Sequence, residues 1–516
     1  MRPGEPLEEP APPEIPLESR TEAFPATVYR RGFLPRVNGT GRPGGERRVH
    51  MLFSTSCSMY QQWQSNLLFW SHRESGCKGE VTRLVSGCEA EENNFKDMRV
   101  SLPGVTAKLS NRTLLRQSTN PNAKVRETPE LPESRNIIYS NKPYAVLDWF
   151  EHHKDEVLAD DVVVIVDPDM LMIRPIPWDF SPPSKFGAAG WPGFPTVHIE
   201  RGRPVSQEYG LGSAWVKGWH EDFVPYYGLD YQYQNIYNGS DFAEAVCGKG
   251  SHCAEVDRAY VEQHLAGGAP MILAAEDVEA TVNAWQDFTT NFNKISKGKI
   301  FQAEMYTYSM AIAHVDILQT TVDSLMVSLD DSPKEAWQFM GPIAASESLL
   351  KKTKAVVPKV SCHDPINSLG AENFPPVMHY CQWHKAHDAA GRLWAFHKGH
   401  VPAFIFDCDL PLLKMPPDDL INVQTTTLGR RGALMVCLIK SQINAAIVAH
   451  ANAFCSAKHV AEKKNGPSRF RILSDYAKAA CPSTDPRICG NGLFRLEPAD
   501  PTIGDANVSS KHFVHN

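Results

Sequence analysis

The chain has 516 residues and a formal net charge of −7, the difference between 52 Lys and Arg and 59 Asp and Glu. Hydrophobic residues make up 42% of it and charged residues 22%, which is typical of a chain that buries a core and excludes one that is disordered throughout. The slightly acidic balance argues against a dedicated nucleic-acid binder, which usually carries a basic face, and the length predicts two or three domains.

The first 46 residues differ in composition from the rest of the chain. They hold nine prolines and few large apolar side chains, which predicts an extended stem without a core. A regular apolar pattern begins directly after them. We therefore predict a stem at 1–46, an ordered α/β domain at 47–420 and a small helical and loop extension at 421–516.

The ordered region begins with a strand, a helix and a second strand. Residues 49–55 are predicted to form a buried strand, and residues 80–86 a second strand. Between them, large apolar side chains from Tyr60 to Trp70 recur at helical spacing. This order predicts a parallel sheet covered by helices.

The next stretch is predicted to be surface structure followed by a helix. Residues 90–138 are polar and rich in Asn, Pro and Arg, which predicts a long surface excursion. A helix is expected from about Pro143 to His153, since proline is well suited to a first helical turn.

Residues 162–166, Val-Val-Val-Ile-Val, form the clearest strand in the sequence. Five consecutive β-branched residues predict a strand buried on both faces, as at the centre of a parallel sheet. The run ends in Asp167-Pro168-Asp169. Because ligands bind at the carboxyl ends of strands in open α/β sheets, these two carboxylates lie where a site is expected.

The rest of the chain alternates loop-rich segments with helices. Residues 185–262 are rich in Gly, Tyr, Trp and Pro and predict a wall built of loops. The pair at 267–268 predicts a glycine turn, and helices are expected at about 274–285 and 300–314. A long helix is predicted at about 429–458, with loops after it.

Cysteines and glycosylation sequons indicate an oxidising compartment. Twelve cysteines without a Cys-X-X-Cys pair, together with four Asn-X-Ser/Thr sequons, favour a lumenal protein over a cytosolic enzyme with scattered thiols. The sequons lie at Asn38, Asn111, Asn238 and Asn507. Cysteines spaced to close short disulfide loops are Cys77 with Cys88, Cys247 with Cys253, and Cys481 with Cys489, and we expect the last pair in particular to be bonded.

Neither a membrane span nor a signal peptide is predicted. The sequence has no run of 18 apolar residues, and its N-terminus lacks the basic, apolar and small-residue order of an export signal. A lumenal location therefore implies that an export signal and any anchor have been removed. If no such segments have been removed, the lack of a signal peptide and of a membrane span indicates a cytosolic protein.

Asp167-Pro168-Asp169 is the strongest candidate for a functional site. In an extended backbone, side chains two residues apart point to the same side, and the proline restricts the backbone between them. Two preorganised carboxylates suit Mn²⁺ or Mg²⁺, which can neutralise a diphosphate. The alternative is an acidic turn that closes the strand.

Three more residues are candidates for the same site. His379 suits a metal already held by Asp, while a packed or hydrogen-bonded histidine and a zinc site with its Cys and His neighbours are the alternatives. Lys398 can reach a phosphate as a point charge, or be a solvated lysine. Glu304 lies among apolar residues on a predicted helix, either as a buried, perturbed carboxylate or as an exposed one.

Six segments, in order along residues 47–420, resemble the plant and algal peptidyl-serine α-galactosyltransferases and, more distantly, the hydroxyproline O-arabinosyltransferases. Those enzymes modify extensin-type wall glycoproteins in the secretory pathway. The segments are VHMLFSTSCSMYQQWQ (49–64), SNKPYAVLDW (140–149), VVVIVDPDMLMIRP (162–175), GRPVSQEYG (202–210), AEMYTYS (303–309) and MHYCQ (378–382).

The resemblance implies a GT-A glycosyltransferase, with a Rossmann-like mixed sheet flanked by helices, a nucleotide-sugar donor and a divalent metal, Mn²⁺ or Mg²⁺. The predicted metal ligands are Asp167, Asp169 and His379. The predicted donor-binding residues are Asp167, Asp169, Asn141, Lys142 and, from its chemistry, Lys398. Glu304 falls in a block that both families share and is the predicted catalytic or acceptor-side carboxylate.

The resemblance leaves the donor sugar open. Pro168 matches the arabinosyltransferase pattern, where the serine galactosyltransferases have alanine, whereas Asp167 and Asn141-Lys142-Pro143 match the galactosyl group. We predict transfer of α-galactose from UDP-galactose, with retention by family analogy, to Ser or hydroxyproline hydroxyls of extensin-like glycoproteins in the ER or Golgi lumen. The alternatives are a UDP-arabinose-dependent hydroxyproline arabinosyltransferase and, in another class, a non-catalytic lumenal carbohydrate-binding protein. Nucleic acid is not an expected partner, and membrane attachment is expected only through an anchor outside this chain.

Overall fold

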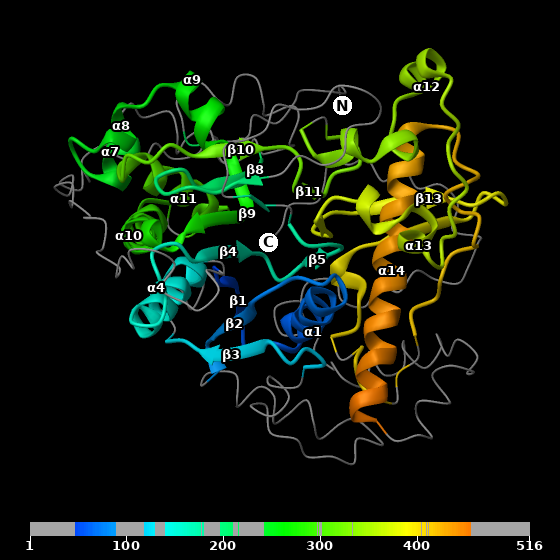
Figure 1. Ribbon diagram of the computed structural model, residues 1–516, viewed down its shortest axis with the longest axis horizontal. Coiled ribbons are helices and arrows are strands. Elements are labelled where there is room, and N and C mark those ends of the chain that lie inside the picture. The colour runs from blue at the N-terminus through cyan, green and yellow to red at the C-terminus, as the bar shows by residue number, and fades with distance from the viewer. Residues whose placement is uncertain are drawn as a thin grey trace, which may run out of the picture.

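The computed structural model of the protein has one large sheet with helices on both faces and a smaller sheet beside it (Figure 1). The residues that it describes are 47–88, 118–129, 140–176, 178–179, 197–209, 215, 242–296, 298, 302–332, 334–403, 405–408, 410 and 412–455. The predicted stem, the four sequon asparagines, Cys481 and Cys489 lie outside the described residues.

The large sheet has seven strands in the order β10-β8-β9-β4-β1-β2-β3. Strands β4, β1, β2 and β3 are parallel to one another, β9 is antiparallel to both β4 and β8, and β10 is parallel to β8. The strands are β1 (Val49–Ser56), β2 (Glu80–Ser86), β3 (Ala123–Glu127), β4 (Val162–Val166), β8 (Val205–Glu208), β9 (Gly267–Ala274) and β10 (Thr320–Val322). The predicted α/β class with a mixed sheet flanked by helices is confirmed.

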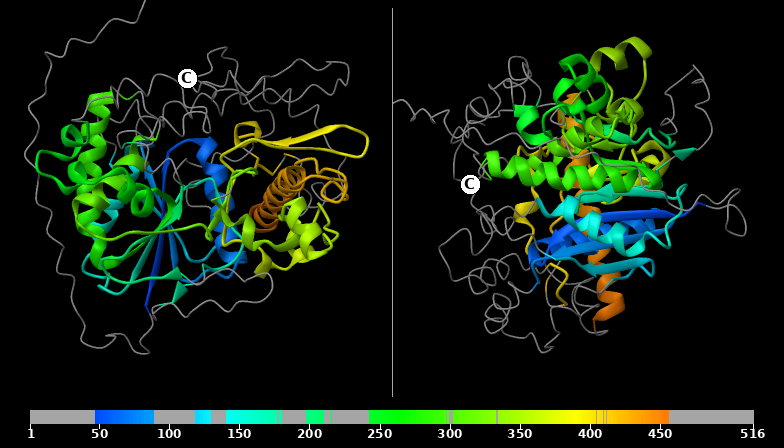
Figure 2. Two further views of the ribbon diagram at one scale, coloured as in Figure 1. Left: turned by 90° about the horizontal axis from the view of Figure 1, so that it is seen from above. Right: turned by 90° about the vertical axis from the view of Figure 1, so that its left-hand side faces the viewer.

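Strand β4 is buried on both faces because its β-branched side chains alternate between two cores. The main helices are α1 (Met59–Glu74), α4 (Asn141–His153), α10 (Ala275–Ser296), α11 (Ala303–His314) and α14 (Thr427–Phe454). Val163 and Ile165 pack with side chains of α4, α10 and α11. Val162, Val164 and Val166 pack with those of α1 on the opposite face, and the left view of Figure 2 shows helices on both sides of the sheet.

Helix α14 belongs to a second core that includes one side of α1. Trp63 and Leu67 of α1, together with Trp337 and Tyr380, pack in the same cluster as the apolar side of α14. The Thr426 hydroxyl accepts a hydrogen bond from the amide of Gly429 at 3.1 Å and caps the helix. By length and composition α14 could cross a membrane, but 67% of its most apolar window is buried inside the fold.

A three-stranded sheet connects the two cores. Its strands are β11 (Met326–Val327), β12 (Val377–His379) and β5 (Met170–Met172), with β12 in the middle. Leu171 of β5 contributes to the core of α14, whereas Met170 and Met172 contribute to the core under the large sheet. Because β5 follows β4 directly, this sheet brings the C-terminal part of the chain to the end of β4.

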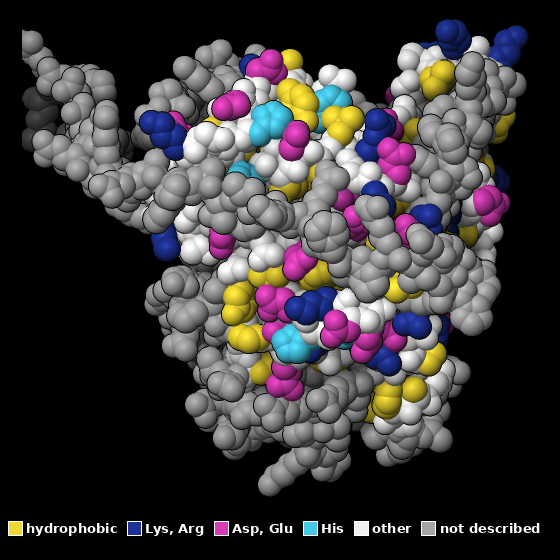
Figure 3. Space-filling view, turned by 60° about the vertical axis from the view of Figure 1, so that its left-hand side comes forward, with side chains coloured by type: hydrophobic (Ala, Val, Ile, Leu, Met, Phe, Trp, Pro, Cys, Tyr) yellow, Lys and Arg dark blue, Asp and Glu magenta, His cyan; other side chains and the backbone are white. Residues whose placement is uncertain are grey.

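The remaining elements are short. They are β6 (Trp178–Asp179), β7 (Val197–His198), α7 (Phe242–Cys247), α8 (His252–Glu255), α9 (Arg258–Tyr260), η4 (Val261–Leu265), η5 (Ala336–Phe339), η6 (Gly341–Ile343), α12 (Glu347–Thr353), α13 (Pro365–Leu369), η7 (Ala371–Asn373), β13 (His384–His387), β14 (Leu393–Phe396) and η8 (Lys398–His400). On the described surface drawn in Figure 3, acidic and basic side chains are interspersed.

The structure corrects three of the predicted segments. The excursion at 90–138 contains β3, an edge strand that the polar sequence concealed because several of its side chains are exposed or half-exposed. The segment at 185–262 contains β8 and several short helices rather than loops alone. Gly267 begins β9 instead of a turn, and a Cβ there would lie 1.9 Å from Ser206 Oγ of β8, so the close approach of the two strands requires glycine.

Four disulfides lie within the described residues: Cys57–Cys88, Cys247–Cys253, Cys362–Cys437 and Cys408–Cys455. The second was predicted. The pairing of Cys77 with Cys88 is wrong, and Cys77 is a free thiol. Cys57 follows β1 and Cys88 follows β2, and because these strands are parallel neighbours, their ends meet.

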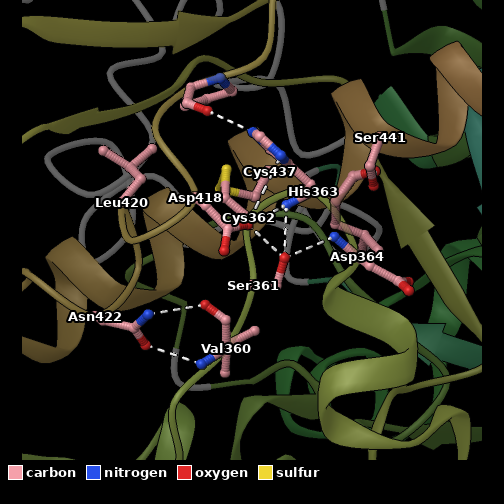
Figure 4. Close-up of a disulfide and its surroundings, with 12 residues drawn as sticks. Val360, Ser361, Cys362, His363, Asp364, Asp418, Leu420, Asn422, Cys437 and Ser441 are labelled. Carbon is pink, nitrogen blue, oxygen red and sulfur yellow. Dashed lines mark hydrogen bonds and ion pairs between the residues drawn. A yellow bond between two sulfur atoms is a disulfide. The ribbon is translucent and has the colours of Figure 1, made fainter.

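The Cys362–Cys437 disulfide attaches α14 to the segment before α13 (Figure 4). The amide of Cys362 also donates a hydrogen bond to the carbonyl of Asp418 at 2.9 Å. The Cys408–Cys455 disulfide links the C-terminal end of the same helix to the segment that precedes it in the sequence. The predicted helical C-terminal part with disulfides is therefore present, while its division from the rest of the chain after residue 420 stays a prediction.

Candidate functional site

Strand β4 delivers two carboxylates to the carboxyl edge of the parallel strands. Asp167 follows Val166 directly, and the amide of Met170 donates a hydrogen bond to the carbonyl of Asp167 at 3.2 Å. Residues 168–169 form a turn rather than the extended backbone that we predicted. The carboxylates nevertheless come together, since one ligand atom each from Asp167, Asp169 and His379 lie within 4.8 Å of one another.

His379 reaches this position through the small sheet. It ends β12, where it pairs across the ladder with Met170 of the antiparallel β5, one residue beyond Asp169. Its Nε2 lies 3.2 Å from Asp169 Oδ1. Burial alone would lower the pKa of His379, but Cys381 and Asp169 outweigh burial and raise that pKa well above its usual value. The ring therefore faces a carboxylate of the site, an arrangement that fits both a metal ligand and a hydrogen-bonded histidine.

Lys398 forms an ion pair with the other carboxylate oxygen of Asp169. Its Nζ lies 2.5 Å from Asp169 Oδ2, and the segment that carries it begins the short helix η8. The carboxylate is buried, which by itself would raise its pKa, but Lys398 and His379 hold the pKa of Asp169 far below its usual range. Lys398 is thus an ion-paired residue of the site, and the solvated-lysine alternative is wrong.

Lys142 joins Asp167 to Glu304. It lies in the first turn of α4, with Nζ at 2.5 Å from Asp167 Oδ1 and at 2.8 Å from Glu304 Oε1. Burial would lower the pKa of Lys142, but Asp167 and Glu304 outweigh it and raise that pKa. The sequence motif Asn141-Lys142-Pro143 therefore places a charged amine between the end of β4 and helix α11.

Glu304 is buried, as one of the two predicted alternatives required. It lies in the first turn of α11, and its Oε2 accepts a hydrogen bond from the amide of Met305 at 3.0 Å. The indole of Trp285 donates to the Glu304 carbonyl at 2.6 Å and so ties α11 to α10 at this point. Asn141 is also buried, and it precedes Lys142 in the first turn of α4.

Two neighbours of the cluster were missed from the sequence. Tyr60, in the first turn of α1, also raises the pKa of Lys398 electrostatically, with a smaller effect than that of Asp169. Cys381 is a free thiol 3.1 Å from Ser328 Oγ, and it acts on the neighbouring His379. A tyrosine at helical spacing gave no signal beyond packing, and nothing in the sequence distinguishes Cys381 as the cysteine that stays unpaired.

The donor set suits a hard divalent cation. Two carboxylates and one imidazole are typical ligands of Mn²⁺, and carboxylates also suit Mg²⁺. The zinc alternative finds less support, since the buried His384 of the same segment turns its Nδ1 to Asp330, at 2.9 Å. Among the residues that the structure describes, Asp167, Asp169 and His379 are the group that can hold a metal.

Comparison with known proteins gives similarities of sequence over part of the chain. No family model matches the chain. Residues covering 56% of the chain are 27% identical to a peptidyl serine alpha-galactosyltransferase of Arabidopsis thaliana, and a stretch covering 29% is 31% identical to the protein of that name from Chlamydomonas reinhardtii. The matches span 29% and 18% of the lengths of those relatives, so the chain corresponds to less than a third of either.

Solved structures that align with the chain are also glycosyltransferases by name, but the overall agreement is low. The galactosyltransferase LgtC covers 64% of the chain at 13% identity, over 87% of its own length, with a TM-score of 0.27. The bifunctional glycosyltransferase WbbM covers 77% at 12% identity, over 52% of its own length, with a TM-score of 0.28. Mouse xyloside xylosyltransferase 1 covers 64% at 7% identity, over 96% of its own length, with a TM-score of 0.24.

Proposed function

We propose that this chain is a metal-dependent, GT-A-type glycosyltransferase that transfers a galactosyl group from UDP-galactose to hydroxyl groups of a Ser- or hydroxyproline-rich protein. The observation that carries the proposal is the cluster at the end of β4, where Asp167 and Asp169 meet His379, Lys142 and Lys398. Similarity to two proteins named peptidyl serine alpha-galactosyltransferase supports galactose as the sugar and a seryl hydroxyl as the acceptor.

The residues divide into two functions in this proposal. Asp167, Asp169 and His379 would hold Mn²⁺ or Mg²⁺, which neutralises the diphosphate leaving group when bound. Lys398 and Lys142, with Asn141 beside the latter, lie within reach of the same point and would contact the donor. A lysine supplies a compact positive charge, which suits a phosphate.

Glu304 is proposed as the carboxylate that acts on the acceptor side. It is buried, and Lys142 holds its Oε1 at 2.8 Å, so its position is fixed before any substrate binds. A fixed carboxylate can stabilise charge that develops in a transition state without reorganising. The same lysine contacts Asp167, which couples the acceptor-side carboxylate to the donor side of the site.

An oxidising compartment is part of the proposal. Four disulfides join described cysteines, including two that hold α14 across 75 and 47 residues of sequence. Disulfides of this kind persist in secretory compartments and are rare in the cytosol. Location in the lumen of the ER or Golgi fits a protein that glycosylates secreted proteins.

The test is transfer by the purified chain to a Ser- and hydroxyproline-rich peptide, with a panel of UDP-sugars and Mn²⁺, followed by mass spectrometry. We expect one hexose increment with UDP-galactose, abolished by EDTA and by Asp169→Asn. Asp155→Asn, which alters an exposed aspartate after α4, is the matched control and should transfer normally. A pentose increment from UDP-arabinose would instead indicate an arabinosyltransferase, and sugar binding without any product would indicate a non-catalytic protein.

A further inference from the structure

The carboxylates of the site already carry cations that belong to the chain. Three carboxylates, Asp167, Asp169 and Glu304, face two ammonium groups, Lys142 and Lys398, at distances of 2.5 to 2.8 Å. His379 lies 3.2 Å from the same Asp169. The cluster is therefore close to neutral in the absence of any ligand, and a divalent cation does not meet a pair of bare aspartates there.

These ion pairs lie away from solvent, so they differ from exposed pairs that contribute little. The side chains of Lys142 and Asp169 are 10% and 7% exposed, and that of Lys398 is 25% exposed. In such surroundings an ammonium is costly to leave unpaired, and each lysine is held strongly by its carboxylate. A cation that takes an oxygen from Asp167 or Asp169 must therefore compete with a lysine for it.

We propose that Lys142 and Lys398 are resident cations that compete with the divalent ion for Asp167 and Asp169, so that the donor diphosphate is needed to make metal binding strong. The inference rests on the metal and donor of the proposed function. A diphosphate gives the displaced ammonium a new anion to bind, and the metal and the diphosphate then each favour binding of the other. Such a coupling is reciprocal and typically amounts to about 5- to 150-fold in affinity.

The two lysines do not have equal roles in this competition. Lys142 is shared between Asp167 and Glu304, so it keeps one carboxylate when the other turns to the metal. Lys398 is paired, among the described residues, with Asp169 alone. The geometry therefore makes Lys398 the ammonium that moves to the diphosphate, while Lys142 stays on Glu304 and contacts the donor from that position.

The experiment measures Mn²⁺ binding without nucleotide, from the free-ion signal in electron paramagnetic resonance, for wild type, Lys142→Met and Lys398→Met. Loss of a competing charge is expected to tighten Mn²⁺ binding by about tenfold in both variants. UDP binding in saturating Mn²⁺ is expected to weaken by about tenfold in Lys398→Met and to change less in Lys142→Met. Lys124→Met, which alters an exposed pair with Glu80 at the opposite edge of the sheet, is the matched control.

A lysine with a purely structural role would give the opposite sign, because its loss would loosen the site and weaken Mn²⁺ binding. Unchanged or weaker Mn²⁺ binding in both folded variants overturns the inference, as does undetectable binding to all four proteins. A melting curve with and without Mn²⁺ reports folding, and we expect Mn²⁺ to stabilise Lys398→Met more than wild type. Tighter Mn²⁺ binding in the two lysine variants, together with no galactose transfer by the wild type, would sustain this inference while refuting the proposed function.

Discussion

Asp167 and Asp169 are two residues apart, yet their surroundings carry opposite balances of charge. On the side of α4 and α11, two carboxylates share the single ammonium of Lys142. On the side of β12 and η8, the single carboxylate of Asp169 is shared by Lys398 and His379. Asp167 is also more exposed, at 21% of its side chain against 7% for Asp169.

This difference in surroundings indicates that the two aspartates of the Asp-X-Asp motif have different roles. Asp169 pairs with two residues from the C-terminal part of the fold, Lys398 and His379, which are remote from it in the sequence. Asp167 is the more accessible ligand, and its lysine retains Glu304 if Asp167 is lost. Asp169 is therefore expected to matter for both folding and function, and Asp167 for function alone.

The largest expected effect is on metal-dependent donor binding, where the two aspartates should behave alike. Asp167→Asn and Asp169→Asn each keep shape but remove one anionic ligand, so UDP binding in Mn²⁺ should weaken by about tenfold or more and transfer should nearly cease. Calorimetric titration of UDP with and without Mn²⁺ measures the effect. UDP binding that is equally strong without metal would show that the pair is structural.

Removal of the Cys362–Cys437 disulfide tests how far the C-terminal side depends on its long-range link. Replacing both cysteines by Ala should lower the free energy of unfolding by roughly 4 kcal/mol, because the bond closes a loop of 75 residues. The matched control is the Cys247–Cys253 pair beside α7, which closes a loop of only 6 residues and should cost roughly 2 kcal/mol. Urea unfolding of both double variants measures the difference, and equal losses would contradict it.

Stability in the absence of metal should distinguish the two aspartates. Asp169→Asn leaves Lys398 and His379 without their buried anion and should cost about 3 kcal/mol. Asp167→Asn leaves Lys142 paired with Glu304, so the buried ammonium keeps a partner, and the variant should cost only about 1 kcal/mol. Urea unfolding in EDTA is the measurement, and similar losses for the two variants would remove the distinction between the two sides.

The same two sides differ in how much of them the sequence could predict. Five β-branched residues that end in Asp167 indicate a central strand and its functional end, because burial on both faces leaves a strong local pattern. Lys142 and Glu304 lie in first turns of helices that periodicity and proline placement indicate. This side of the site is therefore built from local signals, apart from the turn at 168–169.

The other side depends on contacts that no local pattern specifies. His379 meets Asp169 because β12 runs antiparallel to β5 in one particular register. Cys57 pairs with Cys88 because two parallel strands end side by side, whereas proximity in the sequence suggested Cys77. Short strands such as β3 and β8 carry too few apolar residues to be seen without their neighbours in the sheet.

The smallest effect on stability is expected for Glu304→Gln, which tests whether the side of α4 and α11 has a catalytic role separate from its structural one. The amide keeps the size and hydrogen-bonding capacity of Glu304, and Lys142 retains Asp167, so the melting temperature should stay nearly unchanged. If Glu304 acts on the transition state, turnover should fall by about tenfold or more while UDP affinity changes little. Steady-state kinetics beside UDP titration separates these quantities.

Asp287→Asn, on the neighbouring α10, serves as the control and should show wild-type kinetics. Wild-type turnover in Glu304→Gln would reduce Glu304 to a counterion of Lys142, and an equal loss of turnover and UDP affinity would place it on the donor instead.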